Sequence, residues 1–335
     1  MRQDYLVLKS LVKIFGSGEN AFKAVDNVDI EVQEGELVTL LGPSGCGKTT
    51  TLRMISGFEL PTSGEIRIDG EDVSTTPPNQ RPNTMVFQNY ALFPHLTVFE
   101  NIAYGLKIRR QSAENIRKQT EEIMLLVGLE GLAERSPAQL SGGQQQRVSL
   151  ARSLVMEPKV LLLDEPLSNL DAKLRVSTRL EIRKLQQRVG ITSVYVTHDQ
   201  EEAMTLSDRV VIMHQGKIMQ IGSPQAIYAR PANRFVADFI GKANFLEGNV
   251  GSLGSSRELV LDIVGKKFQV AVEPGSFSEG QKVLLVVRPE SINLEPKRPD
   301  TLTGTVHEAV YLGSQMVYEV GVAETIITVE IANPQ

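Results

Sequence analysis

Eight residues, G-P-S-G-C-G-K-T at positions 42–49, restrict the fold of this chain more than any other segment. They lie between an apolar run at residues 37–41 and a helix expected at residues 48–56. In this strand-loop-helix context the pattern G-x-x-x-x-G-K-[ST] forms a phosphate-binding loop. Its glycines let backbone N–H groups face one concave site, and the N-terminus of the helix adds partial positive charge. The chain is therefore predicted to be an α/β protein that binds nucleotide phosphates.

Two side chains of this segment are suited to ATP and Mg²⁺. The ammonium of Lys48 is expected to reach the β- and γ-phosphates, and the Thr49 hydroxyl is expected to be a ligand of Mg²⁺. Cys46 occupies a free position of the loop. The predicted nucleotide-binding residues are the whole loop and the residue that follows it: Gly42, Pro43, Ser44, Gly45, Cys46, Gly47, Lys48, Thr49 and Thr50.

Two acidic residues follow a second buried run. Residues 159–163 are mostly apolar, as a central strand covered by helices must be, and Asp164 and Glu165 come directly after them. Asp164 is predicted to supply a second oxygen ligand for Mg²⁺. Glu165 is predicted to accept a proton from the water that attacks the γ-phosphate. The alternative is that both acids merely cap the strand.

The pattern of strand-like and helical segments divides the chain near residue 240. Residues 1–240 alternate strands and helices, which predicts a largely parallel sheet, with helices at 97–107, 112–127, 142–158 and 172–189. Residues 241–335 contain strand-like runs at 268–272, 283–287, 303–307, 316–320 and 326–331, and a turn at 251–256. This second region is predicted to form a small β-barrel.

Composition excludes several classes of protein. The 335 residues carry 35 basic and 40 acidic side chains, a formal charge of -5, which disfavours non-specific binding to nucleic acid. The single cysteine cannot form an internal disulfide, and the N-terminal residues MRQDYLVLKS carry charge where a signal peptide needs an apolar core. No apolar stretch reaches the roughly 18 to 20 residues that span a bilayer. We expect a cytoplasmic protein whose membrane role depends on a partner.

The peptide L-S-G-G-Q at residues 140–144 extends this interpretation. Together with the motifs above, it resembles the signature peptide of the ATP-binding cassette (ABC) family. Ser141, Gly142 and Gly143 open a predicted helix and form a second anion-binding nest, with Gln144 beside them. The chain has only one P-loop lysine, so two half-sites imply two chains. The resemblance implies a head-to-tail homodimer in which the signature of one cassette closes on the γ-phosphate held by the other.

Other positions also resemble the family's motifs. Gln88 looks like the Q-loop glutamine that reaches Mg²⁺ and the attacking water, and His198 looks like the switch histidine that contacts the γ-phosphate. Asp171 ends S-N-L-D, where the family commonly has S-A-L-D, so Asn169 is a mild departure. The resemblance thus implies Glu165, His198 and Gln88 as catalytic residues, and Thr49, Gln88 and Asp164 as metal ligands. The alternatives are a surface amide at Gln88 and a structural histidine at His198.

An aromatic residue near the first strand stacks on the adenine in this family. Phe15 stands at that place in the sequence, and Phe22 is the competing candidate. Stacking needs only a π-face, so phenylalanine can serve.

The segment from Gln88 to His95 indicates what the ATPase acts on. It is apolar and aromatic although it is predicted to be a loop, and such surfaces usually bind a partner. The resemblance implies that two transmembrane permease subunits dock here, against a helical subdomain at about residues 90–158. The alternative is a loop that folds back onto its own helices.

The region after residue 240 resembles the OB-type (TOBE-type) regulatory domain of binding-protein-dependent importers, through V-R-P-E at 287–290 and G-T-V at 304–306. The resemblance implies an importer ATPase on the cytoplasmic face of the membrane, fed by a periplasmic or extracellular substrate-binding protein. Residues 83–107 and 190–248 look most like the spermidine/putrescine subgroup. Ferric iron, sugar and phosphonate importers share most of these motifs. A cassette ATPase that remodels DNA or ribosomes is the alternative from another class, and it would be expected to carry a second cassette or a long coiled-coil insertion.

Overall fold

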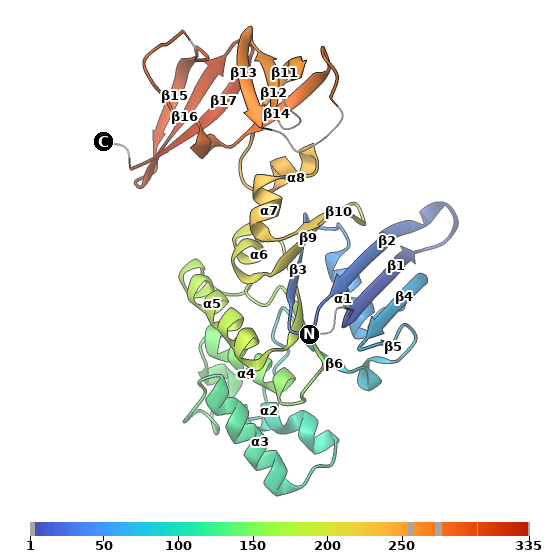
Figure 1. Ribbon diagram of the computed structural model, residues 1–335. Coiled ribbons are helices and arrows are strands. Elements are labelled where there is room, and N and C mark those ends of the chain that lie inside the picture. The colour runs from blue at the N-terminus through green and yellow to red at the C-terminus, as the bar shows by residue number, and fades with distance from the viewer. Residues whose placement is uncertain (1–3, 254–257, 272–276, 300, 334–335) are drawn as a thin grey trace. The chain divides into compact units, whose positions relative to one another are not determined.

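The computed structural model describes residues 4–253, 258–271, 277–299 and 301–333. The chain divides into two compact units, Met1–Val236 and Ala237–Gln335. Figure 1 shows that the first unit combines helices with strands and that the second unit consists mainly of strands.

A six-stranded sheet runs through the first unit. Its strand order is β10-β9-β3-β8-β7-β6, and all neighbours are parallel except β9 and β10. The strands are β3 (Leu37–Leu41), β6 (Asn83–Val86), β7 (Val160–Asp164), β8 (Thr192–Thr197), β9 (Arg209–His214) and β10 (Lys217–Gly222). Every residue of β3, β7 and β8 is buried, as helices on both faces of a parallel sheet require. The predicted α/β class with a largely parallel sheet is confirmed.

A second, antiparallel sheet packs against the first. Its order is β2-β1-β4-β5, formed by β1 (Leu6–Phe15), β2 (Phe22–Val32), β4 (Ser63–Ile68) and β5 (Glu71–Asp72). Apolar residues of β1, β2 and β4 share one core with residues of β3, β7, β8, β9 and α1 (Lys48–Ser56). The alternation of strands and helices in the sequence did not separate these strands from the parallel sheet.

Three helices form a group of their own, visible in turquoise to green in Figure 1. They are α2 (Val98–Ile108), α3 (Ala113–Leu126) and α4 (Gly142–Leu154), which pack around a core that includes Ile102, Met124 and Val148. The helix predicted to run from residue 142 to 158 ends at Leu154, because Glu157 takes a left-handed conformation (φ 49°) before Pro158. Proline disfavours a helical conformation in the residue that precedes it.

The remaining helices of this unit follow the strands of the parallel sheet. They are α5 (Ala172–Val189), α6 (Gln200–Leu206), α7 (Pro224–Ala229) and α8 (Arg234–Phe239), the last of which crosses into the second unit. Short 3-10 helices occur at Gly18–Asn20, Pro78–Gln80 and Pro137–Gln139. α5 begins and ends where the sequence predicts, with Asp171 as its N-cap and Gly190 in a left-handed C-cap.

The second unit is β-rich, as expected. One sheet has the order β13-β12-β11-β14 and the other β15-β16-β17. The strands are β11 (Asn244–Leu253), β12 (Glu258–Ile263), β13 (Lys266–Ala271), β14 (Lys282–Val287), β15 (Thr305–Tyr311), β16 (Gln315–Val322) and β17 (Thr325–Ala332), and a 3-10 helix lies at Pro289–Ser291. Both sheets contribute to one core, which contains Leu246, Leu261, Val320 and Val329.

Among the described residues of the second unit, the strands form two separate ladders, which differs from the single continuous ladder of a simple barrel. Instead, the Asn244 side chain links β11 to β17, because its amide nitrogen donates to Thr328 O (2.7 Å) and its oxygen accepts from Thr328 N (2.7 Å). The predicted turn at residues 251–256 is wrong at 251–253, which belong to β11, and its remainder lies outside the described residues. The end of the predicted strand at Val272 also lies outside them.

Candidate functional site

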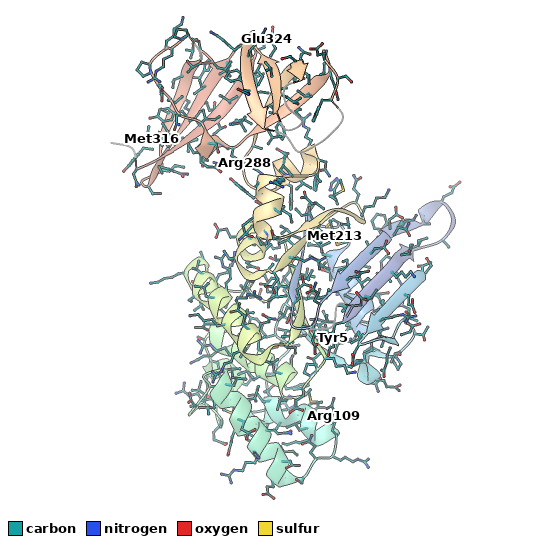
Figure 2. All side chains as sticks on the ribbon, viewed as in Figure 1. Tyr5, Arg109, Met213, Arg288, Met316 and Glu324 are labelled. Atoms are coloured by element: carbon teal, nitrogen blue, oxygen red, sulfur yellow. The ribbon has the colours of Figure 1, made fainter. Side chains whose placement is uncertain are left out.

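The loop between β3 and α1 folds as a tight turn that requires glycine at two positions. Gly47 has φ 104°, and a Cβ atom there would lie 2.4 Å from Ala24 O. A Cβ atom on Gly42 would lie 2.2 Å from the carbonyl oxygen of Met213, which is buried in the core of the first unit (Figure 2). Real Cβ atoms do not approach carbonyl oxygens so closely. The close packing of this loop on its neighbours therefore excludes side chains here.

Lys48 is buried, and its ammonium faces the loop itself. Its Nζ donates to Gly42 O (2.7 Å) and to Pro43 O (2.9 Å), and it lies 3.7 Å from Cys46 Sγ. Burial raises the pKa of the Cys46 thiol, with the nearby lysine acting in the opposite direction. The ammonium is thus held at the loop by carbonyl oxygens that a phosphate oxygen can replace.

Asp164 ends β7 beside the first turn of α1. The Thr49 hydroxyl lies 3.4 Å from Asp164 Oδ1, and the carboxylate is buried. Burial and, next, the charge of Glu165 raise the pKa of Asp164, while Arg53, Thr49 and Lys48 act in the opposite direction. A hydroxyl and an incompletely neutralised carboxylate are oxygen donors of the kind that Mg²⁺ prefers, so these residues fit the ion.

Glu165 is held in a strained conformation next to His198. Its φ of 42° is left-handed, which is uncommon for a residue other than glycine and is often found at functional sites. Glu165 N donates to Val196 O (3.0 Å), and Glu165 Oε1 lies 3.2 Å from Nδ1 of the exposed His198. The structure therefore brings together two of the three predicted catalytic residues, at the carboxyl ends of β7 and β8.

Gln88, the third of these residues, follows β6 at the same edge of the sheet. β6 pairs with β7 in parallel, with Val86 opposite Leu163. Gln88 is exposed, and its side chain has no hydrogen-bond partner among the residues that the structure describes. Its backbone oxygen accepts a hydrogen bond from Asn169 Nδ2 (2.8 Å).

A buried carboxylate that the sequence did not single out supports the turn that carries His198. Glu202 Oε2 accepts hydrogen bonds from the Tyr195 and Thr197 hydroxyls, both at 2.8 Å. Burial raises the pKa of Glu202, and the two hydroxyls oppose this change. An acidic residue in the first turn of a helix is normally interpreted as an exposed side chain that interacts with the helix dipole. The sequence therefore does not indicate that Glu202 is buried and accepts these two hydrogen bonds.

The signature peptide begins α4. Ser141 is the N-cap residue, and it forms a capping box with Gln144, whose side-chain oxygen accepts from Ser141 N (2.9 Å). The next residues, Gly142 and Gly143, pack against Leu170 and Leu174. Within the described residues, no hydrogen bond or ion pair joins this segment to residues 42–49 of the same chain.

Asp171, at the end of S-N-L-D, is the N-cap of α5. Its Oδ1 accepts a hydrogen bond from Leu174 N (2.9 Å). The carboxylate therefore caps the N-terminus of α5.

The two aromatic candidates for adenine stacking lie side by side. Phe15 and Phe22 are direct partners in the antiparallel pair of β1 and β2, so their side chains share one face. Both are exposed, and the Lys13 ammonium lies 4.9 Å from the centre of the Phe15 ring. The register of β1 and β2 therefore does not decide which of the two phenylalanines stacks on the adenine.

Tyr90 and Phe93 of the aromatic segment at residues 89–95 contact the helices that follow, while Asn89, Ala91, Pro94 and His95 are exposed. Tyr90 is buried, and its carbonyl oxygen accepts from Ser149 Oγ (3.0 Å) and from Arg152. The Phe93 backbone exchanges hydrogen bonds with the Asn101 side chain, and its ring lies 4.6 Å from that of Tyr104. The loop is thus partly packed against α2 and α4 of its own chain.

Exposed aromatic surface remains beside this loop. Tyr104 is 41% exposed, and Phe58 is 54% exposed with its ring 5.8 Å from that of Phe87. The sequence did not identify these two residues, because apolar side chains at single positions in helices and turns are usually part of a core.

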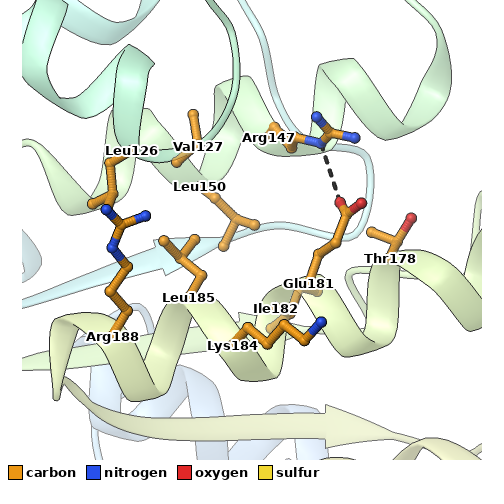
Figure 3. Close-up of a pocket in the computed structure, with 10 residues that line it drawn as sticks. All are labelled: Leu126, Val127, Arg147, Leu150, Thr178, Glu181, Ile182, Lys184, Leu185 and Arg188. Atoms are coloured by element: carbon orange, nitrogen blue, oxygen red, sulfur yellow. Dashed lines mark ion pairs between the residues drawn. The ribbon is translucent and has the colours of Figure 1, made fainter.

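A hollow of about 220 Å³ lies elsewhere in the first unit, between α3, α4 and α5 (Figure 3). Arg147 Nε lies 3.3 Å from Glu181 Oε2 across it, and Leu150 and Leu185 are among its apolar lining. It contains none of the predicted site residues.

The described residues contain neither a membrane-spanning helix nor a cluster of typical metal ligands. None of their helices is long and apolar enough to cross a membrane. No group of three or more His, Cys, Asp or Glu side chains among them is arranged to hold a metal ion.

Known protein families match both units. The family model described as ABC transporter matches residues 25–168, and the one described as TOBE domain matches residues 285–335. The spermidine/putrescine import ATP-binding protein PotA of Mesorhizobium japonicum is 51% identical over 302 residues, which cover 90% of this chain and 82% of that protein. The ferric ion import ATP-binding protein FbpC 1 of Rhizobium meliloti is 48% identical over 324 residues, or 95% and 88% of the two chains.

Solved structures match the cassette. A dimeric ATP-binding cassette in a post-hydrolysis state with ADP and phosphate aligns with a TM-score of 0.57 and 34% identity, over 65% of this chain and 98% of that one. The protein cbiO1 of Clostridium perfringens, part of the transporter complex cbiONQ, aligns with a TM-score of 0.63 and 28% identity, over 69% and 93% of the two chains.

Proposed function

The chain belongs to the ABC transporter family of ATP-binding import subunits, and from this premise we propose that it hydrolyses ATP to drive polyamine uptake through separate membrane subunits. The observation that carries the proposal is the convergence of Lys48, Thr49, Asp164 and Glu165 at the carboxyl ends of β3 and β7. ATP binding and hydrolysis are the activity of this family.

Each residue has a definite task in the proposed reaction. Lys48, the backbone of residues 42–47 and Thr50 bind the phosphates, while Phe15 or Phe22 stacks on the adenine. Glu165 accepts a proton from the attacking water, and His198, 3.2 Å away, orients that carboxylate and contacts the γ-phosphate. Thr49, Asp164 and Gln88 hold Mg²⁺, which neutralises phosphate charge when it is bound.

The active form is a homodimer. Ser141, Gly142, Gly143 and Gln144 are placed to complete the ATP site of a second copy, with Asp171 at the junction. The absence of a hydrogen bond between this segment and residues 42–49 of the same chain, within the described residues, supports a site shared by two chains. The dimeric cassette with bound ADP and phosphate supports a dimer.

Two permease subunits dock beside residues 88–95, where Phe58 and Tyr104 leave aromatic surface exposed. The chain is then a peripheral subunit on the cytoplasmic face of the membrane, and an external substrate-binding protein delivers the substrate. It makes no functional contact with nucleic acid. Residues 1–240 form the nucleotide-binding domain, with a helical subdomain at about 90–158, and residues 241–335 form a regulatory domain of the TOBE type, which the family match supports.

Polyamine is the favoured substrate because relatives named for spermidine and putrescine import reach 51% identity. Iron import is the second candidate, since a relative named for ferric ion import is 48% identical over slightly more of the chain. Sugar and phosphonate importers are further alternatives.

Uptake and hydrolysis together test the proposal. Proteoliposomes that contain this chain, its cognate permease pair and its binding protein are expected to take up labelled spermidine or putrescine when Mg-ATP is inside. Uptake of ferric ion without polyamine would assign the second candidate. Nucleic-acid-stimulated ATPase activity without any uptake would refute transport.

Glu165→Gln tests the assigned base within the same system. We expect Mg-ATP binding to remain and the hydrolysis rate to fall by at least about 10²-fold, because a positioned base contributes about 10² to 10⁴ in rate. Glu157→Gln is the matched control, because Glu157 also has a left-handed backbone (φ 49°) but precedes the other end of β7. Equal hydrolysis rates of Glu165→Gln and the wild type would contradict the assignment of Glu165 as the catalytic base.

A further inference from the structure

The loop between β7 and α5 contains Glu165 and contacts Gln88, two of the residues assigned to the reaction. Ser168 N and Ser168 Oγ donate to Glu165 O at 3.2 and 3.0 Å, and Asn169 Nδ2 donates to Gln88 O at 2.8 Å. Adjacent residues of one loop thus hold the backbone of Glu165 and the backbone of Gln88.

The sheet explains why one loop reaches both. β6 and β7 are parallel neighbours, so the loops that follow them leave the same edge of the sheet. Glu165 and Asn169 lie in the loop after β7, and Gln88 lies in the loop after β6. In the described part of the chain, the Asn169 amide makes the one hydrogen bond that joins these two loops.

The segment around Gln88 needs such support. Tyr90 and Ala91 both have left-handed backbones, with φ of 60° and 47°, which is costly for residues other than glycine. Ser149 and Arg152 hold the carbonyl oxygen of Tyr90 from the side of α4. The Asn169 amide holds the carbonyl oxygen of Gln88 from the opposite end of the turn, and the Gln88 side chain stays free to contact a ligand.

We propose that Asn169 is a positioning residue for ATP hydrolysis: its side-chain amide holds the backbone of Gln88 so that the Gln88 side chain meets the Mg²⁺ and the attacking water assigned above. This inference rests on the proposed function. An alanine at position 169 cannot donate this hydrogen bond, so the residue that departs from S-A-L-D supplies the connection.

Asn169→Ala and Asn169→Leu test the proposal. Leucine approximates the size of the side chain, carries no charge and has no N–H donor, so it separates the hydrogen bond from bulk. Both variants are expected to lower kcat about two- to tenfold, the effect of one net hydrogen bond, with unchanged ATP affinity and melting temperature. Asn115→Ala, an exposed asparagine on α3, is the control and should leave kcat unchanged.

A double-mutant cycle with Gln88→Ala identifies the partner. If Asn169 acts through Gln88, the kcat of Gln88→Ala/Asn169→Ala should equal that of Gln88→Ala alone. Multiplicative losses, a wild-type kcat in both single variants, or a loss explained by weaker ATP binding would overturn the positioning role. Wild-type protein without Mg-dependent ATPase activity would instead refute the proposed function itself.

Discussion

At the residue scale, Lys48 places a positive charge in the phosphate-binding loop. Its ammonium is buried and is held by the carbonyl oxygens of Gly42 and Pro43. A buried charge needs such partners, because an unpaired one would be strongly unfavourable. Phosphate oxygens, which carry negative charge, are better partners for the ammonium than neutral carbonyls, so nucleotide can replace them.

Lys48→Ala is therefore expected to weaken ATP binding itself. A hydrogen bond to a charged group contributes about 1.5 to 3 kcal/mol, which corresponds to about a 10- to 150-fold rise in Kd. Equilibrium titration with a fluorescent ATP analogue measures the change, and Lys118→Ala on α3 is the control. Wild-type affinity in Lys48→Ala would contradict the assignment of this lysine.

Asp164 gives a prediction about pH. Its raised pKa means that the folded chain without nucleotide disfavours the ionised carboxylate. The resulting loss of stability applies at pH values above the pKa of Asp164 in the folded chain, and it disappears as the pH falls below the ordinary carboxyl range, where both states are protonated. Asp164→Asn removes this charge.

We expect Asp164→Asn to melt at a higher temperature than the wild type at pH 8 without nucleotide, with the difference shrinking toward pH 4. The same variant should lose Mg-dependent hydrolysis, because an amide is a poor replacement for a carboxylate ligand. Thermal unfolding across this pH range and ATPase assays measure the two effects. A variant that is less stable at pH 8 would show that the charge is well compensated.

At the scale of elements, the sequence determined the starts of several helices well. α2 begins at a capping box, in which Thr97 N donates to Glu100 Oε2 (3.0 Å) and Glu100 N donates to Thr97 Oγ1 (3.2 Å). The spacing T-x-x-E predicts this start, because each side chain satisfies a backbone N–H that the helix leaves free.

Thr97→Ala is expected to destabilise the first unit by about 1 kcal/mol, the usual effect of losing an N-cap. Chemical denaturation measures it. Thr97→Ser, which keeps the hydroxyl oxygen, should stay close to the wild type. Equal stability of the alanine and serine variants would mean that the cap contributes nothing here.

At the scale of the whole molecule, the signature peptide lies at the start of a helix and is not hydrogen-bonded to the phosphate loop of its own chain within the described residues. Two-chain sites give a clear expectation for mixed dimers. Each site takes its phosphate loop from one chain and its signature peptide from the other. In a dimer of one Lys48→Ala chain and one Ser141→Arg chain, the altered phosphate loop therefore faces the altered signature peptide in one site, and the other site is intact.

That mixed dimer should therefore retain ATP at one site and hydrolyse it at that site. If each chain instead formed a complete site, both sites would be damaged and hydrolysis would be lost. Differently tagged chains allow the mixed dimer to be isolated, and bound nucleotide and turnover are then measured per dimer. Homodimers of each variant serve as the inactive controls.

Sequence alone determined the features that depend on local rules. The glycines at 42 and 47, the lysine that follows and the acidic pair at 164–165 all indicated a phosphate site, since each has a short-range physical requirement. The parallel sheet, the caps of α2 and α5 and the β-rich second region followed from hydrophobic period and capping residues.

Tertiary structure decided whatever depends on which segments meet. The strands β1, β2 and β4 alternate buried and exposed residues, whereas every residue of β3, β7 and β8 is buried, but their pairing in a separate sheet was decided by the tertiary structure. Tyr90 was expected at a surface, yet it is buried, and Ser149 and Arg152 of α4 donate hydrogen bonds to its carbonyl oxygen. In the sequence, Glu202 and Asn169 are ordinary polar residues, and only the fold shows that they form hydrogen bonds with Tyr195 and Gln88. Hydrogen bonds that depend on the tertiary fold produce no periodic pattern in the sequence from which they could be predicted.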